Sequence, residues 1–251
     1  MIISSMELVK LEMKLERLIF RQFFYAGDFI LIHGAPGVGK SRFAMSMAVE
    51  MAMNGERVVY ADSETPKSLL IKRVSEIGSH PNLYYVLDET VTIDYIVAIE
   101  GVVIIDNFSS NFLGVEQKDQ VEVSKVLRPL ADSVRQKDGR QTVILLHHDN
   151  RAGTMFGSSE FLRSASLVIH LLRSRLIIDK SRHEYPKVRS TFEYGIYPNG
   201  LTLTEVCPLS TDDDDDKDDS EEGHIPYEDY PDVPRSTVRS WVKRGKIGKK
   251  K

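Results

Sequence analysis

The sequence predicts an α/β fold in which a mostly parallel central sheet carries antiparallel strands at one edge. Up to about residue 165, apolar runs of strand length alternate with segments of helical periodicity, as expected for parallel strands joined by helices. Between residues 167 and 206, four strand-like runs follow one another through tight turns, which predicts the antiparallel edge; they span 167–172, 175–178, 188–194 and 201–206. A glycine-rich loop between the first buried strand and a helix is the expected centre of this fold.

The bulk composition is that of an ordinary globular protein. The chain has 251 residues, of which 41% are hydrophobic and 28% charged, enough for one large domain with a small appendage. No apolar run approaches the ~20 residues of a membrane-spanning helix, and the N-terminus lacks a signal-peptide pattern. The single cysteine, Cys207, excludes an internal disulfide. We therefore expect a cytoplasmic protein with no membrane partner.

The glycine-rich loop follows the apolar run 29–32 and precedes a helix over 42–53. It consists of Gly34, Ala35, Pro36, Gly37, Val38, Gly39, Lys40 and Ser41, and it fits G-x-x-x-x-G-K-[ST] at every fixed position. In this context backbone N–H groups and the helix N-terminus bind phosphates, and the lysine contacts the β- and γ-phosphates. The Ser41 hydroxyl would ligate Mg²⁺. The sequence thus predicts binding of a nucleoside triphosphate, taken to be ATP, with Mg²⁺.

Two carboxylates are candidates for the chemistry. Asp106 ends the continuous apolar run 101–106, as the second acidic element of such ATPases does, and is expected to position Mg²⁺. Glu64 follows the second strand, 57–62. If that strand neighbours the loop strand, Glu64 would face the γ-phosphate and orient or deprotonate the attacking water. Glu64 is our candidate base and Asp62 the alternative, and a solvated turn carboxylate is the competing interpretation.

The remaining core elements are predicted from periodicity. Residues 66–77 are typical of a helix and 83–87 of a short strand, whereas 91–99 is ambiguous between the two. Residues 119–137 form an amphipathic pattern whose apolar positions, Val121 among them, are expected to face inward. A buried strand over 141–146 follows.

These motifs together resemble the RecA-like branch of the phosphate-loop ATPases, which includes RepA-type plasmid helicases, the recombinase RadA and DnaB-like helicases. The resemblance spans about 20–206 and includes Glu64, Asp106 and the pair His147-His148 after a core strand. It implies a RecA-like core and a γ-phosphate sensor at His147 or His148. Core-edge histidines satisfied by hydrogen bonds are the alternative. Size and layout also suggest an ATPase encoded by an archaeal virus or plasmid.

Lys180 and Arg182 resemble the Lys-x-Arg pair that DnaB- and RadA-type ring ATPases direct at the nucleotide of the neighbouring subunit. This resemblance implies a homo-oligomer, a hexameric ring or a filament, in which ATP is hydrolysed between subunits. A cation placed in this way accelerates hydrolysis by ~10³-fold or more. Two solvated charges in a hairpin are the alternative.

DNA, single- or double-stranded, is the expected partner. Contacts are predicted on the loops 109–118 and 149–157, where Arg151 lies and where Phe112 and Phe156 either stack on bases or pack inward. The C-terminal tail resembles the recognition helix of a helix-turn-helix, and a basic tail without sequence preference is the competing interpretation. The tail cations expected to face DNA are Arg235, Arg239, Lys243 and Arg244.

Four parts are expected along the chain: an N-terminal helix at 1–25, with helical periodicity over 5–24, an ATPase domain at 26–207, an acidic disordered linker at 208–224 and a basic tail at 225–251. Residues 212–222 hold nine acidic side chains and residues 235–251 hold eight Lys or Arg, so local charge is hidden in the net charge of −4.

The function expected from these parts is a DNA-stimulated ATPase motor of the helicase or replication-initiation type. An ATP-switched DNA-binding regulator with little turnover is the alternative, and a clock-type or signalling NTPase that does not act on nucleic acid is a third possibility.

Overall fold

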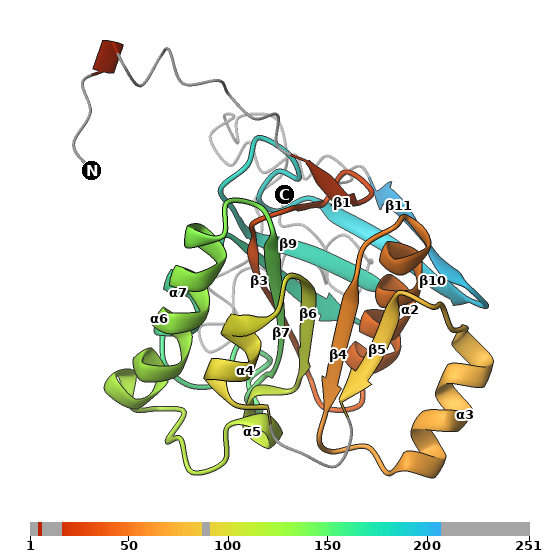
Figure 1. The fold of residues 1–251 in the computed structure, drawn as a ribbon, viewed down its shortest axis with the longest axis horizontal. Coiled ribbons are helices and arrows are strands. Elements are labelled where there is room, and N and C mark those ends of the chain that lie inside the picture. The colour runs from red at the N-terminus through yellow and green to blue at the C-terminus, as the bar shows by residue number, and fades with distance from the viewer. Residues whose placement is uncertain (1–4, 7–16, 87–90, 207–251) are drawn as a thin grey trace, which may run out of the picture. The chain divides into compact units, whose positions relative to one another are not determined.

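The computed structural model describes residues 5–6, 17–86 and 91–206. Within these residues a nine-stranded sheet forms the centre of the fold (Figure 1). Its strands are β3 (Phe29–Gly34), β4 (Val58–Asp62), β5 (Leu83–Val86), β6 (Gly101–Asp106), β7 (Gln141–His148), β8 (Leu167–Leu172), β9 (Arg175–Ser181), β10 (Thr191–Tyr197) and β11 (Gly200–Val206). The spatial order is β11-β10-β9-β8-β3-β7-β6-β4-β5.

The sheet is parallel from β8 to β5 and antiparallel from β8 to β11, as the sequence predicts. The expected fold class, a mostly parallel sheet with antiparallel strands at one edge, is therefore confirmed. Because all the parallel strands point the same way, the loops that follow β3, β4, β6 and β7 meet at one edge of the sheet. That edge is where ligands bind in open α/β sheets.

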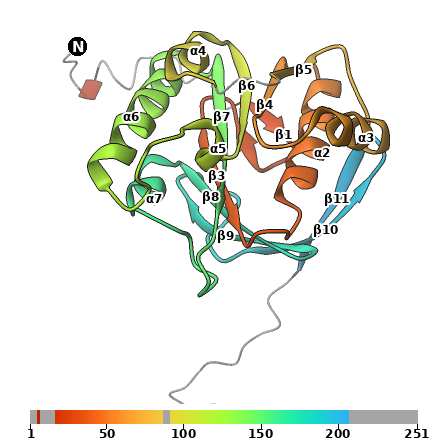
Figure 2. The ribbon, with the colours of Figure 1, turned by 90° about the horizontal axis from the view of Figure 1, so that it is seen from below.

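Helices cover both faces of the sheet. They are α2 (Lys40–Met53), α3 (Lys67–Ile77), α4 (Ile93–Ala98), α5 (Phe108–Asn111), α6 (Gln120–Gln136) and α7 (Glu160–Ser164). Figure 2 shows α2 and α3 on one side and α4, α6 and α7 on the other. Side chains of β3 alternate between two hydrophobic cores, with Ile30 and Ile32 on the α2 side and Phe29 and Leu31 on the α6 side. Burial on both faces explains the uninterrupted apolar runs.

The helix expected over 5–24 is wrong for its last part. Residues 18–25 form a hairpin of two short strands, β1 (Leu18–Phe20) and β2 (Phe24–Tyr25), while 7–16 lie outside the described residues. Arg21 at the turn has a φ of 48°, which no helix contains, and its guanidinium pairs with Glu50 of α2 at 2.7 Å. Tertiary contacts therefore override a spacing that also suited a helix.

Three further expectations need correction or completion. The ambiguous segment 91–99 is the helix α4, whose N-cap Thr92 accepts a hydrogen bond from the Tyr95 N–H. Val121, expected to face inward, is 64% exposed at the start of α6. The strand expected from Val188 begins at residue 191. The linker 208–224 and the tail 225–251 lie outside the described residues, so their expected roles stay predictions.

Candidate nucleotide-binding site

The candidate site is a cavity of about 450 Å³ at the edge where the parallel strands end. The loop between β3 and α2 forms one wall, and the segments that follow β4, β6 and β7 form the others. This volume lies in the range that holds drug-sized ligands and cofactors. Every candidate residue for phosphate and metal binding that has a polar side chain lines it: Lys40, Ser41 and Asp106.

Glycines allow the loop its shape. Gly37 and Gly39 have φ values of 77° and 106°, a left-handed conformation that other L-residues rarely adopt, although a Cβ at either position would meet no atom within 4 Å. At Gly34 the constraint is space, because a Cβ there would lie 2.5 Å from the Leu171 carbonyl oxygen of β8. The loop fits the predicted phosphate cradle, with α2 beginning directly at Lys40.

Lys40 is only 6% exposed and points back into the loop. Its ammonium donates to the carbonyl oxygens of Gly34 at 2.7 Å and Ala35 at 3.0 Å, and lies 3.2 Å from Nδ1 of His148. Burial lowers the pKa of Lys40, and the nearby carboxylates of Asp149, Asp106 and Glu64 oppose that effect. A phosphate oxygen would bind this ammonium more strongly than the neutral carbonyl oxygens do, because both partners would then be charged.

Asp106 lies against Tyr60 and Ser41. Burial raises the pKa of Asp106 to about 6, although hydrogen bonds from Tyr60 and Ser41 act to lower it. The Tyr60 hydroxyl donates to Oδ2 of Asp106 at 2.7 Å. The second carboxylate, Asp62, has its buried Oδ2 atom without a hydrogen-bond partner among the described residues. One serine hydroxyl and two carboxylates supply the hard oxygen ligands that Mg²⁺ prefers, so these residues fit the ion.

Glu64 extends into the cavity from the turn after β4. Oδ1 of Asp62 accepts the N–H groups of Glu64 and Thr65 at 3.0 and 2.8 Å, which fixes the turn. Oε2 of Glu64 accepts from the Asn107 side-chain amide at 2.7 Å. The condition set for this role, that β4 neighbours the loop strand, is not met, because β7 and β6 lie between them. Glu64 still lines the cavity, since the loops converge along the sheet edge.

The two adjacent histidines point in opposite directions. His147 is fully buried, its Nε2 bonded to the Phe156 carbonyl oxygen at 2.7 Å and its ring stacked on Phe161 at 4.1 Å. Burial lowers the pKa of His147 to about 4. His148 instead lines the cavity. Its pKa is lowered, mainly by burial and to a lesser extent by the positive charge of Lys40. His147 thus packs in the core, although its buried Nδ1 has no hydrogen-bond partner among the described residues, and His148 is the histidine of the pair that lines the cavity.

Residues 12–154, more than half of the chain, match the family model described as the AAA domain. The chain belongs to this AAA domain family. The solved structures that resemble it include a KaiC-like protein from Pyrococcus horikoshii OT3, with a TM-score of 0.58, 20% identity, and coverage of 75% of this chain and 99% of that one. FlaH, a flagellar accessory protein from Methanocaldococcus jannaschii, has a TM-score of 0.54 and 13% identity, with coverage of 71% and 90%.

A third solved structure, an ATPase domain, has a TM-score of 0.56 and 16% identity and covers 75% of this chain and 92% of its own. A curated relative, the DNA repair protein RadA of Campylobacter jejuni, is 36% identical over 59 residues, or 23% of this chain. The chain spans 13% of that protein's length. These likenesses confirm the RecA-like phosphate-loop fold that the motifs indicate.

Asn107 of the AAA domain lines the cavity, although the sequence did not indicate it as a site residue. Its amide nitrogen lies 2.7 Å from Oε2 of Glu64 and 3.1 Å from Nε2 of His148, so it joins the candidate base to the candidate sensor. Its side-chain oxygen accepts the Ser110 N–H and caps α5. Its only signal in the sequence is its place directly after Asp106, where an asparagine is also an ordinary helix cap.

Lys180 lies near the end of β9 and Arg182 just after that strand, away from the phosphate loop. Lys180 pairs with Val168 at the start of β8, whereas the loop leaves the other end of β3. The Lys180 ammonium donates to the carbonyl oxygens of Leu162 and Ala165, each at 2.6 Å, at the C-terminal end of α7. Arg182 is exposed, and its guanidinium donates to the Arg163 carbonyl oxygen at 3.3 Å. Neither cation lines the nucleotide cavity.

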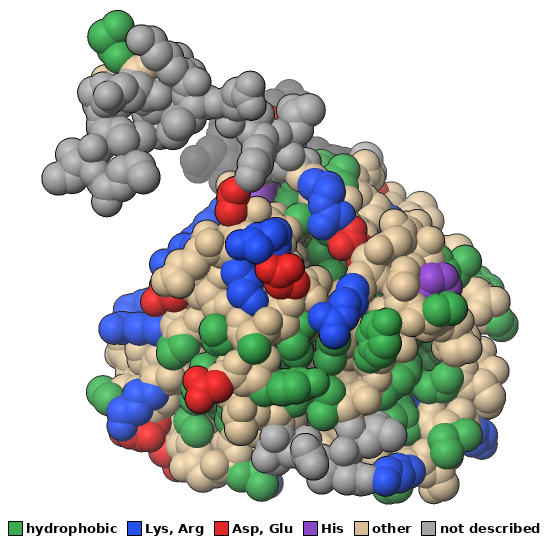
Figure 3. Space-filling model, viewed as in Figure 1, with side chains coloured by type: hydrophobic (Ala, Val, Ile, Leu, Met, Phe, Trp, Pro, Cys, Tyr) green, Lys and Arg blue, Asp and Glu red, His purple; other side chains and the backbone are tan. Residues whose placement is uncertain are grey.

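The loops expected to contact DNA differ in their exposure. Arg151 is exposed, whereas Phe112 is 8% exposed and packs against Phe108, so for Phe112 the inward-packing alternative holds. Phe156 is half-buried with the Lys118 ammonium over its ring at 5.7 Å. On the described residues of the face in Figure 3, basic and acidic side chains are interspersed rather than gathered by sign. The tail cations lie outside the described residues.

Among the helices that the structure describes, none has the length and apolar character needed to cross a membrane.

Proposed function

We propose that this AAA-domain chain binds ATP with Mg²⁺ in the cavity and hydrolyses it. The observation that carries the proposal is the grouping of Glu64, Asn107, His148 and Lys40 within one cavity, each with a polar atom within 3.2 Å of the next. A glycine loop alone binds phosphate. A loop joined to an oriented carboxylate can also act on a water molecule, because such a base contributes typically 10²–10⁴-fold in rate.

Each side chain would have a distinct task. The loop N–H groups bind the phosphates, and Lys40 exchanges its carbonyl contacts for phosphate oxygens. Ser41 and Asp106 hold Mg²⁺, which when bound neutralises charge that develops on the phosphates. Asn107 orients Glu64, and Glu64 takes the proton of the attacking water.

His148 is suited to sensing because it lies between two donors, the Lys40 ammonium and the Asn107 amide. A neutral imidazole has one acceptor nitrogen and so can satisfy only one donor at a time. When Lys40 turns to a phosphate, His148 is free to bond elsewhere. His148 would thus report occupancy of the phosphate loop to Asn107 and the loops beyond it.

Glu64→Gln tests the hydrolytic role. The change keeps the shape of the side chain and its contact with Asn107 but removes the basic oxygen, so ATP affinity should be retained while turnover falls by ~10²-fold or more. Glu100→Gln is the matched control, because Glu100 is exposed and its ion pair with Arg140 lies outside the cavity. A fully active Glu64→Gln enzyme would contradict the assignment of the base.

The finer proposal is that the protein works as an oligomer on DNA, as a motor of the helicase or replication-initiation type. Three observations support it. Lys180 and Arg182 lie outside the cavity of their own chain, as expected of cations that contact the nucleotide of a second subunit. The matched relative is named a DNA repair protein, and residues 235–251 carry eight Lys or Arg that suit a polyanion. The alternative, an ATP-switched regulator, would bind DNA with little turnover.

Turnover measured with and without single-stranded DNA, double-stranded DNA and RNA, together with oligomer size, separates these possibilities. A motor should hydrolyse ATP faster with a nucleic acid and only when assembled. A regulator should show ATP-dependent DNA affinity and slow turnover. Hydrolysis by a monomer that no nucleic acid alters would contradict both.

A further inference from the structure

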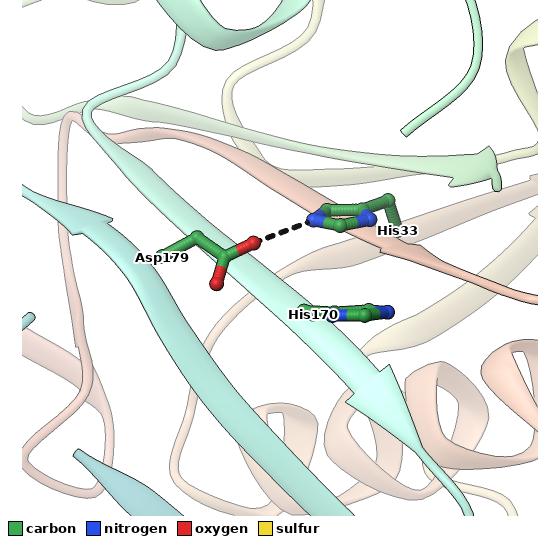
Figure 4. Close-up of side chains that lie close together, drawn as sticks. All are labelled: His33, His170 and Asp179. Carbon is green, nitrogen blue, oxygen red and sulfur yellow. Dashed lines mark hydrogen bonds and ion pairs between the residues drawn. The ribbon is translucent and has the colours of Figure 1, made fainter. Parts of the chain in front are cut away.

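A second polar cluster lies on the other side of β3 from the strands β7, β6 and β4 that complete the nucleotide cavity. It consists of His33 of β3, His170 of β8 and Asp179 of β9, on three adjacent strands (Figure 4). His33 and His170 are direct neighbours across the sheet, and their rings stack at 4.5 Å with an angle of 12° between the planes. One ligand atom from each of the three residues lies within 4.8 Å of the other two. None of the three lines the nucleotide cavity.

A fourth residue, the buried Asp149, contacts one nitrogen of each imidazole ring and so orients both rings. Oδ1 of Asp149 lies 2.7 Å from Nδ1 of His33, and Oδ2 lies 2.9 Å from Nε2 of His170. A carboxylate accepts hydrogen bonds only, so each of these ring nitrogens carries the hydrogen. In the neutral rings the lone pairs then reside on Nε2 of His33 and Nδ1 of His170. A carboxylate that accepts the second N–H is the usual support of metal-bound histidines.

Asp179 completes the cluster on the solvent side. Its Oδ2 atom lies 3.0 Å from Nε2 of His33, and its side chain is 39% exposed. Two groups that both carry lone pairs do not approach this closely unless a positive charge lies between them. That charge is either a proton, which makes His33 an imidazolium, or a metal cation bound by both.

We propose that His33, His170 and Asp179 bind a divalent transition metal of the Zn²⁺ class, with Asp149 as the outer carboxylate. Two imidazole nitrogens and one carboxylate oxygen are a ligand set that suits Zn²⁺, and they leave the fourth tetrahedral position to water. Mg²⁺ prefers oxygen ligands, which distinguishes this site from the one at Ser41 and Asp106. The metal would tie β9 to β3 one residue before the phosphate loop begins.

The test uses the full-length chain, stripped of metal with a chelator and free of nucleotide, titrated with Co²⁺ and with Zn²⁺. The wild-type protein should bind one equivalent of each, measured by calorimetry and by the visible absorption of bound Co²⁺. Asp149→Asn should weaken binding by ~10- to 100-fold, as loss of an outer carboxylate does. His170→Gln should abolish the Co²⁺ absorption, and Asp179→Asn should lower the affinity at least ~10-fold.

Glu193→Gln is the matched control, because Glu193 is an exposed carboxylate on the adjacent strand β10, paired with Arg175 outside the cluster. It should bind Co²⁺ like the wild type. Asp179→Asn keeps the proposal testable if His170→Gln does not fold, since Asp179 is partly exposed. A wild-type chain that binds neither metal overturns the proposal, as does unchanged affinity in Asp179→Asn. ATP turnover is not part of the readout, so failure here leaves the proposed function standing.

Discussion

Lys40 and Lys180 are held in the same way, towards opposite ends of the central strands of the sheet. Each ammonium donates to two backbone carbonyl oxygens within 3.0 Å, and burial lowers the pKa of each. Their surroundings differ. Lys40 lines a cavity and has Asp149, Asp106 and Glu64 nearby, whereas the charge that acts on Lys180 is the repulsive one of Arg182.

The difference shows why one lysine can bind a ligand while the other stabilises a helix. The carbonyls that hold Lys40 belong to a glycine loop whose N–H groups are themselves suited to phosphate, so its contacts can be exchanged. The carbonyls that hold Lys180 are those at the end of α7, where a cation satisfies groups that no helical N–H reaches. The two lysines make similar hydrogen bonds, so their different positions in the fold decide which one can bind a ligand and which one stabilises a helix end.

Lys40→Ala should have the largest effect. Lys40 supplies the positive charge of the phosphate loop, residues 34–41. Because the substitution removes a charge-assisted contact to phosphate, ATP affinity should fall by ~100-fold or more. The measurement is binding of a fluorescent ATP analogue. Lys125→Ala is the control, because Lys125 is exposed on α6 and paired with Glu122. Unchanged affinity in Lys40→Ala would remove the central assignment.

Mixing two inactive variants tests whether the Lys180 end also meets a nucleotide. Arg182→Ala subunits keep their own phosphate loop, and Lys40→Ala subunits keep Arg182. If Arg182 acts between subunits, each variant alone should be nearly inactive, and the mixture should recover a part of wild-type turnover. Recovery that is absent at every mixing ratio, with normal oligomer size, would leave Arg182 as a surface charge bonded to α7.

The strands and the phosphate loop could be predicted because local patterns decide them. Burial on both faces produced the apolar runs that end at Asp106, and the glycine spacing is a property of the loop alone. Asn107 and the His33 cluster could not be predicted in this way. Their hydrogen-bond partners are 21 to 146 residues distant in the chain, so only the strand order brings them together. The helix predicted over residues 18–25 was wrong for the same reason, because the conformation of Arg21 is held by an ion pair with Glu50, 29 residues further along the chain.

The pH dependence of stability distinguishes the cavity from the core beside it. Folding raises the pKa of Asp106 from 3.8 to about 6, so its stabilising contribution is present below pH ~4 and is lost as the pH rises through about 6. Folding lowers the pKa of His147 from 6.5 to about 4, so its contribution is present above pH ~6.5 and is lost as the pH falls towards 4. The two effects oppose each other over one window.

Removing one of the two groups should therefore leave the pH dependence that is caused by the other. Relative to the wild type, Asp106→Asn should gain about 3 kcal/mol of unfolding free energy between pH 4 and pH 7, and His147→Phe should lose a similar amount over the same interval. Urea unfolding of the nucleotide-free protein in a chelator measures both. Asparagine can still accept from Tyr60, and phenylalanine can still stack on Phe161, so packing changes little. Curves that stay parallel to the wild type at all pH values would contradict the two pKa shifts.

Lys180→Met should have the smallest effect and the most specific one. Methionine keeps the apolar length of the side chain but leaves the Leu162 and Ala165 carbonyls without their donor, which should cost about 1 kcal/mol of unfolding free energy. Arg175→Met, on the same strand but paired only with the exposed Glu193, should cost less, because exposed ion pairs contribute little. Amide hydrogen exchange should place the loss in α7 and leave the phosphate loop unchanged. If exchange instead rises in the loop and not in α7, Lys180 supports the nucleotide site rather than the helix, and the contrast with Lys40 disappears.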